Sequence, residues 1–390
     1  MQLASRLDKL PPYLFLEISR KIAEKRSQGA DVVSFGIGDP DIPTPQHILD
    51  ELTRTAQDAP NHRYPESDGL PAMRKSIGDW YKHRFDVTLA DKEIVPLIGA
   101  KEGIAHMALC LIDPGDVALI PDPAYPVYAV GTMFAGGESH LMPLSEERGW
   151  LPDLNAIPAA VAEKAKVMWI NYPNNPTGGL ATLEFFEEVV AYARKYDIAV
   201  CHDAAYSEVT FDGYIAPSFM QVPGAMDVGI EFHSLSKTYN MTGWRVGSAV
   251  GNQQLIDGLV RVKSNIDSGI SNAVQYMGIE ALENTPQEWI DSNNDIYRRR
   301  RDRVVEVLNS IGLSAPTPKS GLYVWARCPE GWTSAAVATE LLDKHAVVVT
   351  PGRGYGAAGE GYIRLSLTTP DDRVEEGLRR LEGWRLPEKP

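Results

Sequence analysis

Short apolar runs of strand length alternate with amphipathic segments between about residue 92 and residue 250. The segments at 101–112 and 183–195 carry apolar side chains at the i, i+3, i+4 and i+7 spacing of a half-buried helix. Parallel strands need such crossover helices, and strands covered on both faces are apolar throughout. The pattern therefore predicts βαβ units around a mostly parallel sheet. The apolar runs are residues 94–98, 117–120, 167–170, 198–201 and 246–250.

The regular alternation of short apolar runs and amphipathic segments ends at about residue 285. A long charged helix is expected at 286–310, followed by a strand at 323–326, a helix at 334–344 and a strand at 363–367. This order predicts a second, smaller α+β domain. We expect the N-terminal arm and part of the small domain in residues 1–45, the large domain in residues 46–284 and the small C-terminal domain in residues 285–390. The predicted fold class is α/β.

Charge and composition exclude several classes of function. The chain has 52 acidic and 38 basic residues, and this net charge of −14 repels phosphate backbones and anionic membranes. We therefore expect no nucleic acid partner, and the arginines at 298–301 and 303 are expected on a solvated helix face. The three cysteines lie far apart without a C-x-x-C pair, so neither a disulfide framework nor a metal site is predicted. No long apolar segment occurs, and a cytoplasmic protein without membrane contact is expected.

The strongest chemical signal is the segment 234–245, which reads S-L-S-K-T-Y-N-M-T-G-W-R. Its Lys237 follows the apolar, β-prone run 228–233 and so lies at a strand end, where α/β sheets bind ligands. The hydroxyls of Ser234 and Ser236 and the guanidinium of Arg245 are suited to hold a phosphate dianion. A partly desolvated amine beside such a group predicts a Schiff-base nucleophile.

This segment resembles the lysine motif of the fold-type I pyridoxal-phosphate enzymes, specifically the class I and II aminotransferases. Four further motifs follow that family's order and span most of the chain. The resemblance implies pyridoxal 5'-phosphate as cofactor, an amino acid and a 2-oxo acid as substrates, and ping-pong kinetics. In that reaction Lys237 forms the Schiff base and moves the Cα proton. The four motifs are D-P-A-Y-P-V-Y from Asp122, N-N-P-T-G from Asn174, D-A-A-Y from Asp203 and Y-I-R-L-S-L from Tyr362.

The resemblance assigns the contacts to the cofactor ring. Asp203 would pair with the pyridinium nitrogen and keep it protonated, although an Asp after a strand is often a helix cap. Tyr206 and Asn175 would hydrogen-bond the phenolic oxygen of the ring. Tyr125 would stack on the ring face, where its alternative is an ordinary core aromatic.

The phosphate contacts are expected from two subunits. The turn at 99–103, G-A-K-E-G, opens a predicted helix, and the backbone N–H groups of Ala100 and Lys101 would bind phosphate at its positive end. Ser234, Ser236 and Arg245 would complete this site. Tyr64 in R-Y-P resembles the tyrosine that reaches the phosphate bound in the neighbouring subunit. The resemblance therefore implies a homodimer with shared active sites.

The substrate residues follow from the same resemblance. Arg364 matches the arginine that binds the substrate α-carboxylate with a bidentate fork. Gly38 lies in G-I-G-D-P, which resembles the segment that closes over that carboxylate. Tyr125 and Asn175 would contact both substrate and cofactor.

Substrate choice is indicated by three further features. The segment P-P-Y-L-F-L-E-I at 11–18, the G-I-G-D-P motif and Lys101 resemble LL-diaminopimelate aminotransferases more than aspartate or aromatic enzymes. This implies that Tyr13 of the partner subunit, Lys101 and Asn272 line the distal side of the pocket. An acidic side chain among residues 66–68 would meet a distal ammonium group. The implied reaction is LL-diaminopimelate:2-oxoglutarate transamination.

Two alternative functions stay open. A broader aminotransferase for aspartate, alanine or aromatic amino acids would use the same residues. A fold-type I carbon-sulfur lyase would keep Lys237, Asp203 and Arg364, but would release pyruvate and ammonia without an oxo-acid acceptor.

Overall fold

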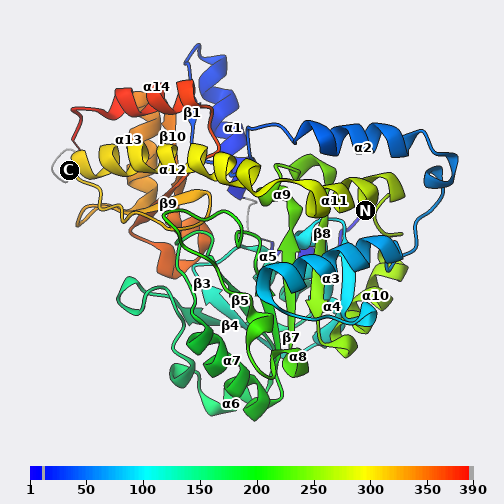
Figure 1. Cartoon of the computed structure of the whole chain (residues 1–390). Helices are drawn as coiled ribbons and strands as arrows, with labels where there is room; N and C mark the ends of the chain where they lie inside the picture. The colour runs from blue at the N-terminus through cyan, green and yellow to red at the C-terminus, as the bar shows by residue number, and fades with distance from the viewer. Residues whose placement is uncertain (11–13, 386–390) are drawn as a thin grey trace.

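A seven-stranded sheet forms the centre of the larger body of the molecule (Figure 1). The computed structural model describes residues 1–10 and 14–385. The strand order is β2-β8-β7-β6-β5-β3-β4, and β8 runs opposite to the other six strands. The mostly parallel sheet predicted from the apolar runs is confirmed. Its strands are β2 (Ile94–Leu97), β3 (Val117–Asp122), β4 (Glu138–Pro143), β5 (Ala165–Asn171), β6 (Ala199–Asp203), β7 (Gly229–Ser234) and β8 (Gly247–Gly251).

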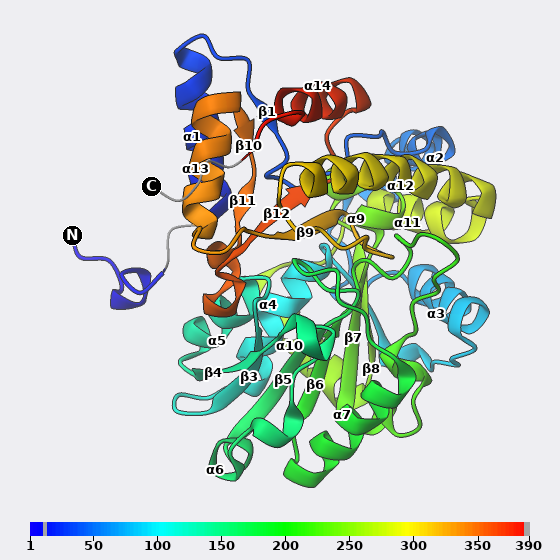
Figure 2. The same ribbon diagram turned by 90° about the vertical axis from the view of Figure 1, so that its left-hand side faces the viewer.

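Helices cover both faces of this sheet (Figure 2). Successive residues of a strand face opposite sides. Val200 of β6 accordingly packs in one core with Phe186, and Cys201 packs in the other core with Met107. This explains why the central strands read as continuous apolar runs. The first core includes residues of α3 (Pro71–Phe85), α7 (Leu183–Tyr196) and α11 (Asn272–Asn284), and the second includes residues of α4 (Ala100–Leu111), α5 (Val127–Ala135) and α10 (Gln253–Ile266).

A smaller body carries two further sheets and its own core. Antiparallel β11 (Thr350–Pro351), β12 (Tyr362–Ser366) and β9 (Tyr323–Arg327) form one sheet. The other pairs β1 (Val33–Ser34) in parallel with β10 (Val347–Val348). The domain boundaries given above stay a prediction. The helices of this part are α1 (Leu14–Ser27), α13 (Ser334–His345) and α14 (Asp371–Leu381), and the remaining helices are α2 (Gln46–Ala56), α6 (Ala159–Ala162), α8 (Ala225–Val228) and α9 (Leu235–Thr238).

The long helix α12 (Gln287–Ser310) connects the two bodies (Figure 1). Its Ile290 packs in a core of the large sheet, whereas Tyr297 and Val304 pack in the core of the smaller body. Within the described ranges, no helix has the length and apolarity that a bilayer crossing requires.

The prediction that the arginines of this helix lie on a solvated face is wrong for two of them. Arg300 and Arg301 are buried. The Arg300 guanidinium lies 2.7 Å from a carboxylate oxygen of Asp41, and Arg301 lies 2.6 Å from one of Asp212. These carboxylates belong to loops far away in the chain, so the local charge pattern of the helix could not indicate them. Buried guanidinium groups need such partners.

Candidate active site

A cavity of about 340 Å³ opens at one edge of the large sheet. Strands β5, β6 and β7 are parallel, and Asn171, Asp203 and Ser234 are their last residues. In open α/β sheets, ligands bind at the carboxyl ends of the strands. The predicted site residues that line this cavity are Gly38, Ala100, Lys101, Tyr125, Asn175, Asp203, Tyr206, Ser234, Ser236, Lys237 and Arg245.

Lys237 lies in the one-turn helix α9, which follows β7 directly. The Ser234 hydroxyl caps this helix by accepting a hydrogen bond from the backbone N–H of Ser236 at 3.3 Å. Lys237 Nζ donates to the carbonyl oxygen of Gly38 at 2.9 Å. Burial lowers the pKa of Lys237, and the positive charges of Arg245 and Arg364 lower it further. The amine is therefore neutral more often than an exposed lysine, as a nucleophile or base requires.

Asp203 presents one unused carboxylate oxygen. Its Oδ2 accepts a 2.7 Å hydrogen bond from the Tyr128 hydroxyl, whose ring stacks on Trp169. Its Oδ1 is buried and has no hydrogen-bond partner among the described residues. Burial raises the pKa of Asp203, although the Tyr128 hydrogen bond acts in the opposite direction. A buried acceptor at a cavity wall fits a cationic N–H donor, such as a protonated pyridine nitrogen.

The turn into α4 forms an anion-binding cradle. The first N–H groups of a helix have no acceptor within the helix, and the helix dipole adds positive potential there. Gly99 has φ +73°, and a Cβ at this position would clash with the Arg245 guanidinium. Glu102 holds the turn, because its Oε2 accepts from the Ile98 N–H at 2.9 Å and from buried Lys263 Nζ at 3.0 Å. With Ser234 and Ser236 at the same cavity, these groups fit a phosphate.

Arg364 lies directly behind the cavity wall. The side chain is fully buried on β12. One guanidinium nitrogen donates to Asn175 Oδ1 and another to the carbonyl oxygen of Gly36, both at 2.9 Å. Asn175 is therefore the link between this arginine and the cavity.

Tyr323 lines the cavity but was not among the predicted site residues. Its hydroxyl lies 3.1 Å from that of Tyr206, and the Arg364 guanidinium carbon lies 3.9 Å from its ring centroid. Burial acts to raise the pKa of Tyr323, but the positive charges of Arg364 and Lys237 outweigh it and lower this pKa. An aromatic residue at the start of a strand indicates a core position, so the sequence carried no signal for this role.

Other predicted residues lie outside the cavity of this chain. Tyr64 is 90% exposed. Asn272 is the first residue of α11, where its Oδ1 lies 3.4 Å from the Gln275 amide nitrogen. Asp68 pairs with Arg74 at 3.0 Å. Tyr13 lies outside the described residues, as do residues 11 and 12.

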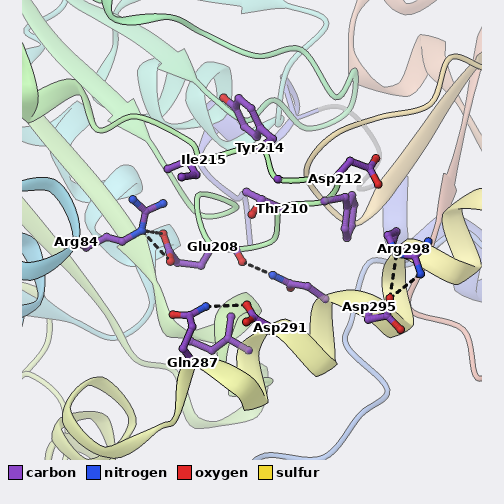
Figure 3. Close-up of a pocket in the computed structure, with 14 residues that line it drawn as sticks. Arg84, Glu208, Thr210, Asp212, Tyr214, Ile215, Gln287, Asp291, Asp295 and Arg298 are labelled. Carbon is purple, nitrogen blue, oxygen red and sulfur yellow. Dashed lines mark hydrogen bonds and ion pairs between the residues drawn. The ribbon is translucent and has the colours of Figure 1, made fainter.

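A second cavity, of about 560 Å³, lies between α12 and the loop at 208–215 (Figure 3). None of the predicted site residues lines it. Four of its charged groups form two ion pairs, with Arg84 at 3.0 Å from Glu208 and Arg298 at 2.7 Å from Asp295. We therefore place the candidate active site at the carboxyl edge of the sheet, where strand ends and a buried amine meet.

The chain is similar to known proteins along nearly its whole length. Residues 30–381 match the family model for aminotransferase class I and II. The chain is 60% identical, over 99% of both chains, to an LL-diaminopimelate aminotransferase of Dehalococcoides mccartyi. The solved structure of substrate-bound BacF from Bacillus subtilis is similar with a TM-score of 0.93 and 34% identity, over 98% of this chain and 97% of that one. A mutant aspartate aminotransferase of Thermus thermophilus is similar with a TM-score of 0.91 and 27% identity, over 97% and 98%.

Proposed function

Because the chain belongs to the class I and II aminotransferases, a family of pyridoxal-phosphate-dependent transaminases, we propose that it transfers an amino group from LL-diaminopimelate to 2-oxoglutarate. The choice of substrate rests on the 60% identity, over nearly the whole of both chains, to an LL-diaminopimelate aminotransferase. The cavity supports the chemistry, since it brings a buried amine, a buried carboxylate and a buried guanidinium to one place.

We propose that the residues of the cavity hold pyridoxal phosphate. The free Oδ1 of Asp203 would accept from the ring nitrogen, and Tyr125 would cover the ring face. Tyr206 and Asn175 would meet the phenolic oxygen. The start of α4, with Ser234, Ser236 and Arg245, would hold the phosphate.

Different side chains of this protein would then have separate roles in the reaction. Bound pyridoxal phosphate supplies an electron sink for the electron pair left at Cα when its proton is removed. Arg364 binds the substrate α-carboxylate and thereby fixes the position of Cα. Lys237 Nζ, whose pKa is lowered by burial, would take the Cα proton and return it at the next step.

We also propose a homodimer with shared active sites. Tyr64 is almost fully exposed and does not line the cavity of its own chain, as expected of a residue that serves a neighbouring site. Asn272 and Lys101 would line the distal side of the pocket together with Tyr13 of the partner subunit. Sedimentation velocity at micromolar concentration should give twice the chain mass, and a monomer would overturn this part of the proposal.

A spectrophotometric titration tests the substrate. LL-Diaminopimelate should convert the absorbance of the enzyme-bound cofactor to that of pyridoxamine phosphate, and 2-oxoglutarate should restore it, as ping-pong kinetics require. Conversion by aspartate or phenylalanine but not by diaminopimelate would indicate a broader aminotransferase. Release of pyruvate and ammonia without an oxo acid would indicate a carbon-sulfur lyase.

Replacement of Arg364 tests the carboxylate site. Arg364→Ala should reduce kcat/KM for amino acids by about 2–5 kcal/mol of transition-state binding, because a buried carboxylate would lose its charged partner. Arg364→Lys is the matched variant, and it should recover only part of the loss because it lacks the bidentate fork. Steady-state kinetics and a melting curve for each variant separate this effect from unfolding. Unchanged kinetics in Arg364→Ala would remove Arg364 from the site.

A further inference from the structure

Tyr323 contacts two residues that belong to different parts of the proposed site. Its hydroxyl lies 3.1 Å from the Tyr206 hydroxyl, and its ring lies beneath the Arg364 guanidinium at 3.9 Å. Tyr206 follows strand β6 of the large sheet, whereas Tyr323 and Arg364 lie on the paired strands β9 and β12 of the smaller body. All three side chains are buried. One tyrosine thus connects the large sheet to the predicted carboxylate site.

The same hydroxyl is close to the segment that holds Lys237. A Cβ at Gly38 would clash with the Tyr323 hydroxyl, and Lys237 Nζ donates to the carbonyl oxygen of this glycine at 2.9 Å. Glycine is therefore required at this position for the close approach. The Tyr323 hydroxyl, the Gly38 backbone and the Lys237 amine meet at one wall of the cavity.

The two tyrosines differ in how firmly they hold their protons. Burial raises the pKa of Tyr206. Burial also acts to raise the pKa of Tyr323, but Arg364 and Lys237 outweigh it and lower this pKa. Either hydroxyl can donate in this contact, and the lowered pKa of Tyr323 makes its hydroxyl the stronger donor. A hydrogen bond from Tyr323 to the Tyr206 oxygen leaves the Tyr206 O–H for the phenolic oxygen of the proposed cofactor.

We propose that Tyr323 is a positioning residue that orients the Tyr206 hydroxyl and the Arg364 guanidinium at the same time. The inference rests on the proposed function, in which Tyr206 meets the phenolic oxygen of the cofactor and Arg364 meets the substrate carboxylate. Phenylalanine at position 323 would keep the ring below Arg364 but leave a buried hydroxyl of Tyr206 without its partner. A leucine would remove both interactions. The two roles are therefore separable by substitution.

A spectroscopic readout isolates the role of the hydroxyl. The charged and titratable groups that face Lys237 include two that raise its pKa, Tyr323 and Asp39, and two that lower it, Arg245 and Arg364. Arg364, Lys237 and Tyr206 face the Tyr323 hydroxyl, and Asp203 faces Tyr206. In Tyr323→Phe, Tyr206 loses the partner that positions it, so its hydrogen bond to the phenolic oxygen of the cofactor is weakened. That hydrogen bond lowers the pKa of the Schiff-base nitrogen of the holoenzyme, so the pH midpoint of its absorbance change should move to higher pH, by about half a unit to one unit.

The matched control for this readout is Tyr355→Phe. Tyr355 is also buried, and its ring centroid lies 4.9 Å from the guanidinium carbon of Arg364. Within the described structure its hydroxyl makes no hydrogen bond to Tyr206. The spectral midpoint of this variant should equal that of the wild type. An equal shift in Tyr355→Phe and Tyr323→Phe would mean that any buried hydroxyl near Arg364 has this effect, and would overturn the specific role of Tyr323.

Kinetics separate the hydroxyl from the ring. Tyr323→Phe should lower kcat about tenfold with little change in KM for the amino acid, because the carboxylate site keeps its ring support. Tyr323→Leu should in addition raise KM for both the amino acid and the oxo acid about tenfold, because Arg364 loses the stacked ring. A role confined to folding stability would instead lower the melting temperature and leave both the midpoint and the KM values unchanged.

The outcomes distinguish this inference from the proposed function. A wild-type enzyme that shows neither a cofactor absorbance nor transamination overturns the proposed function and this inference with it. An active wild type whose Tyr323→Phe variant has the same midpoint and kcat overturns the inference alone. Equal KM values in Tyr323→Leu and Tyr323→Phe would overturn the proposed support of Arg364.

Discussion

The Lys237→Ala variant is expected to lose transaminase turnover while the fold is retained. Lys237 Nζ makes a 2.9 Å hydrogen bond to the carbonyl oxygen of Gly38 and lies at the cavity, so its loss removes the reactive amine and little packing. Loss of acid-base catalysis alone lowers kcat by about 10²–10⁴-fold, and loss of covalent attachment adds to this. The measurement is single-turnover conversion of the bound cofactor by LL-diaminopimelate. Near-normal turnover would overturn the central assignment.

Two controls test whether Lys237→Ala loses turnover because it lacks the Lys237 amine. Lys101 supplies another amine at the cavity, but it lies exposed at the start of α4, 6.0 Å from the Tyr125 ring centroid. Lys101→Ala should therefore retain turnover at saturating substrate, although the KM for LL-diaminopimelate should rise because Lys101 would line the distal side of the pocket. Mixing Lys237→Ala with Tyr64→Ala subunits tests the fold of the first variant, because a hybrid dimer with shared sites combines the intact Lys237 of one chain with the intact Tyr64 of the other. Activity that returns on mixing shows that the Lys237→Ala chain folds and pairs.

The fold could be predicted where the local pattern and the final environment agree. Apolar runs predicted strands β2, β3, β5, β6 and β8 because their side chains are buried on both faces, which holds even for β2 at one edge of the sheet. Strand β4 was not predicted. It pairs only with β3 at the edge of the sheet, and most of its side chains are at least partly exposed. An edge strand of this kind has no apolar run by which the sequence could indicate it.

Site residues could be predicted where a reactive side chain lies at or just after the end of a strand. Asp203 and Lys237 occupy such positions, and both line the cavity. The contact between Tyr206 and Tyr323 joins positions 117 residues apart in the sequence, and no local sequence pattern indicates such a contact. Buried Arg300 was assigned to solvent for the same reason, since its partner Asp41 lies 259 residues away. Tyr64 depends on a second chain, so its role stays a prediction.

A buried ion pair below the site is a further feature that the sequence did not indicate. His202 of β6 lies directly beside Glu231 of β7, with 2.8 Å between Nδ1 and Oε2. The other ring nitrogen lies 3.0 Å from the carbonyl oxygen of Tyr172, so each ring nitrogen has an oxygen partner. Glu231 also accepts from the hydroxyls of Tyr81 and Ser218, at 2.9 and 2.7 Å. His202 precedes Asp203, so the pair lies on the opposite face of the sheet from that carboxylate.

Glu231→Ala is expected to lower the free energy of unfolding by about 3–5 kcal/mol. The variant leaves the His202 ring and the hydroxyls of Tyr81 and Ser218 buried without their shared partner, and the loss of one member of a buried polar network is costly. Urea denaturation at pH 7 measures the loss. Glu231→Gln is the matched variant, since it keeps the volume and one acceptor oxygen, and it should recover part of the stability. Equal stability of Glu231→Ala and wild type would show that the pair contributes little to folding.

The pH dependence of unfolding gives an independent check of the same pair. Burial acts to raise the pKa of Glu231, but the hydrogen bonds from His202, Ser218 and the Phe219 N–H outweigh it and lower this pKa in the folded protein. A carboxyl whose pKa is lower in the folded than in the unfolded state stabilises the fold above its unfolded pKa, about 4.3 for glutamate. That stabilisation is lost as the pH falls through the lowered pKa of the folded state. The wild type should therefore lose more stability than Glu231→Gln between pH 5 and 3, and parallel curves would contradict the contribution of this carboxylate.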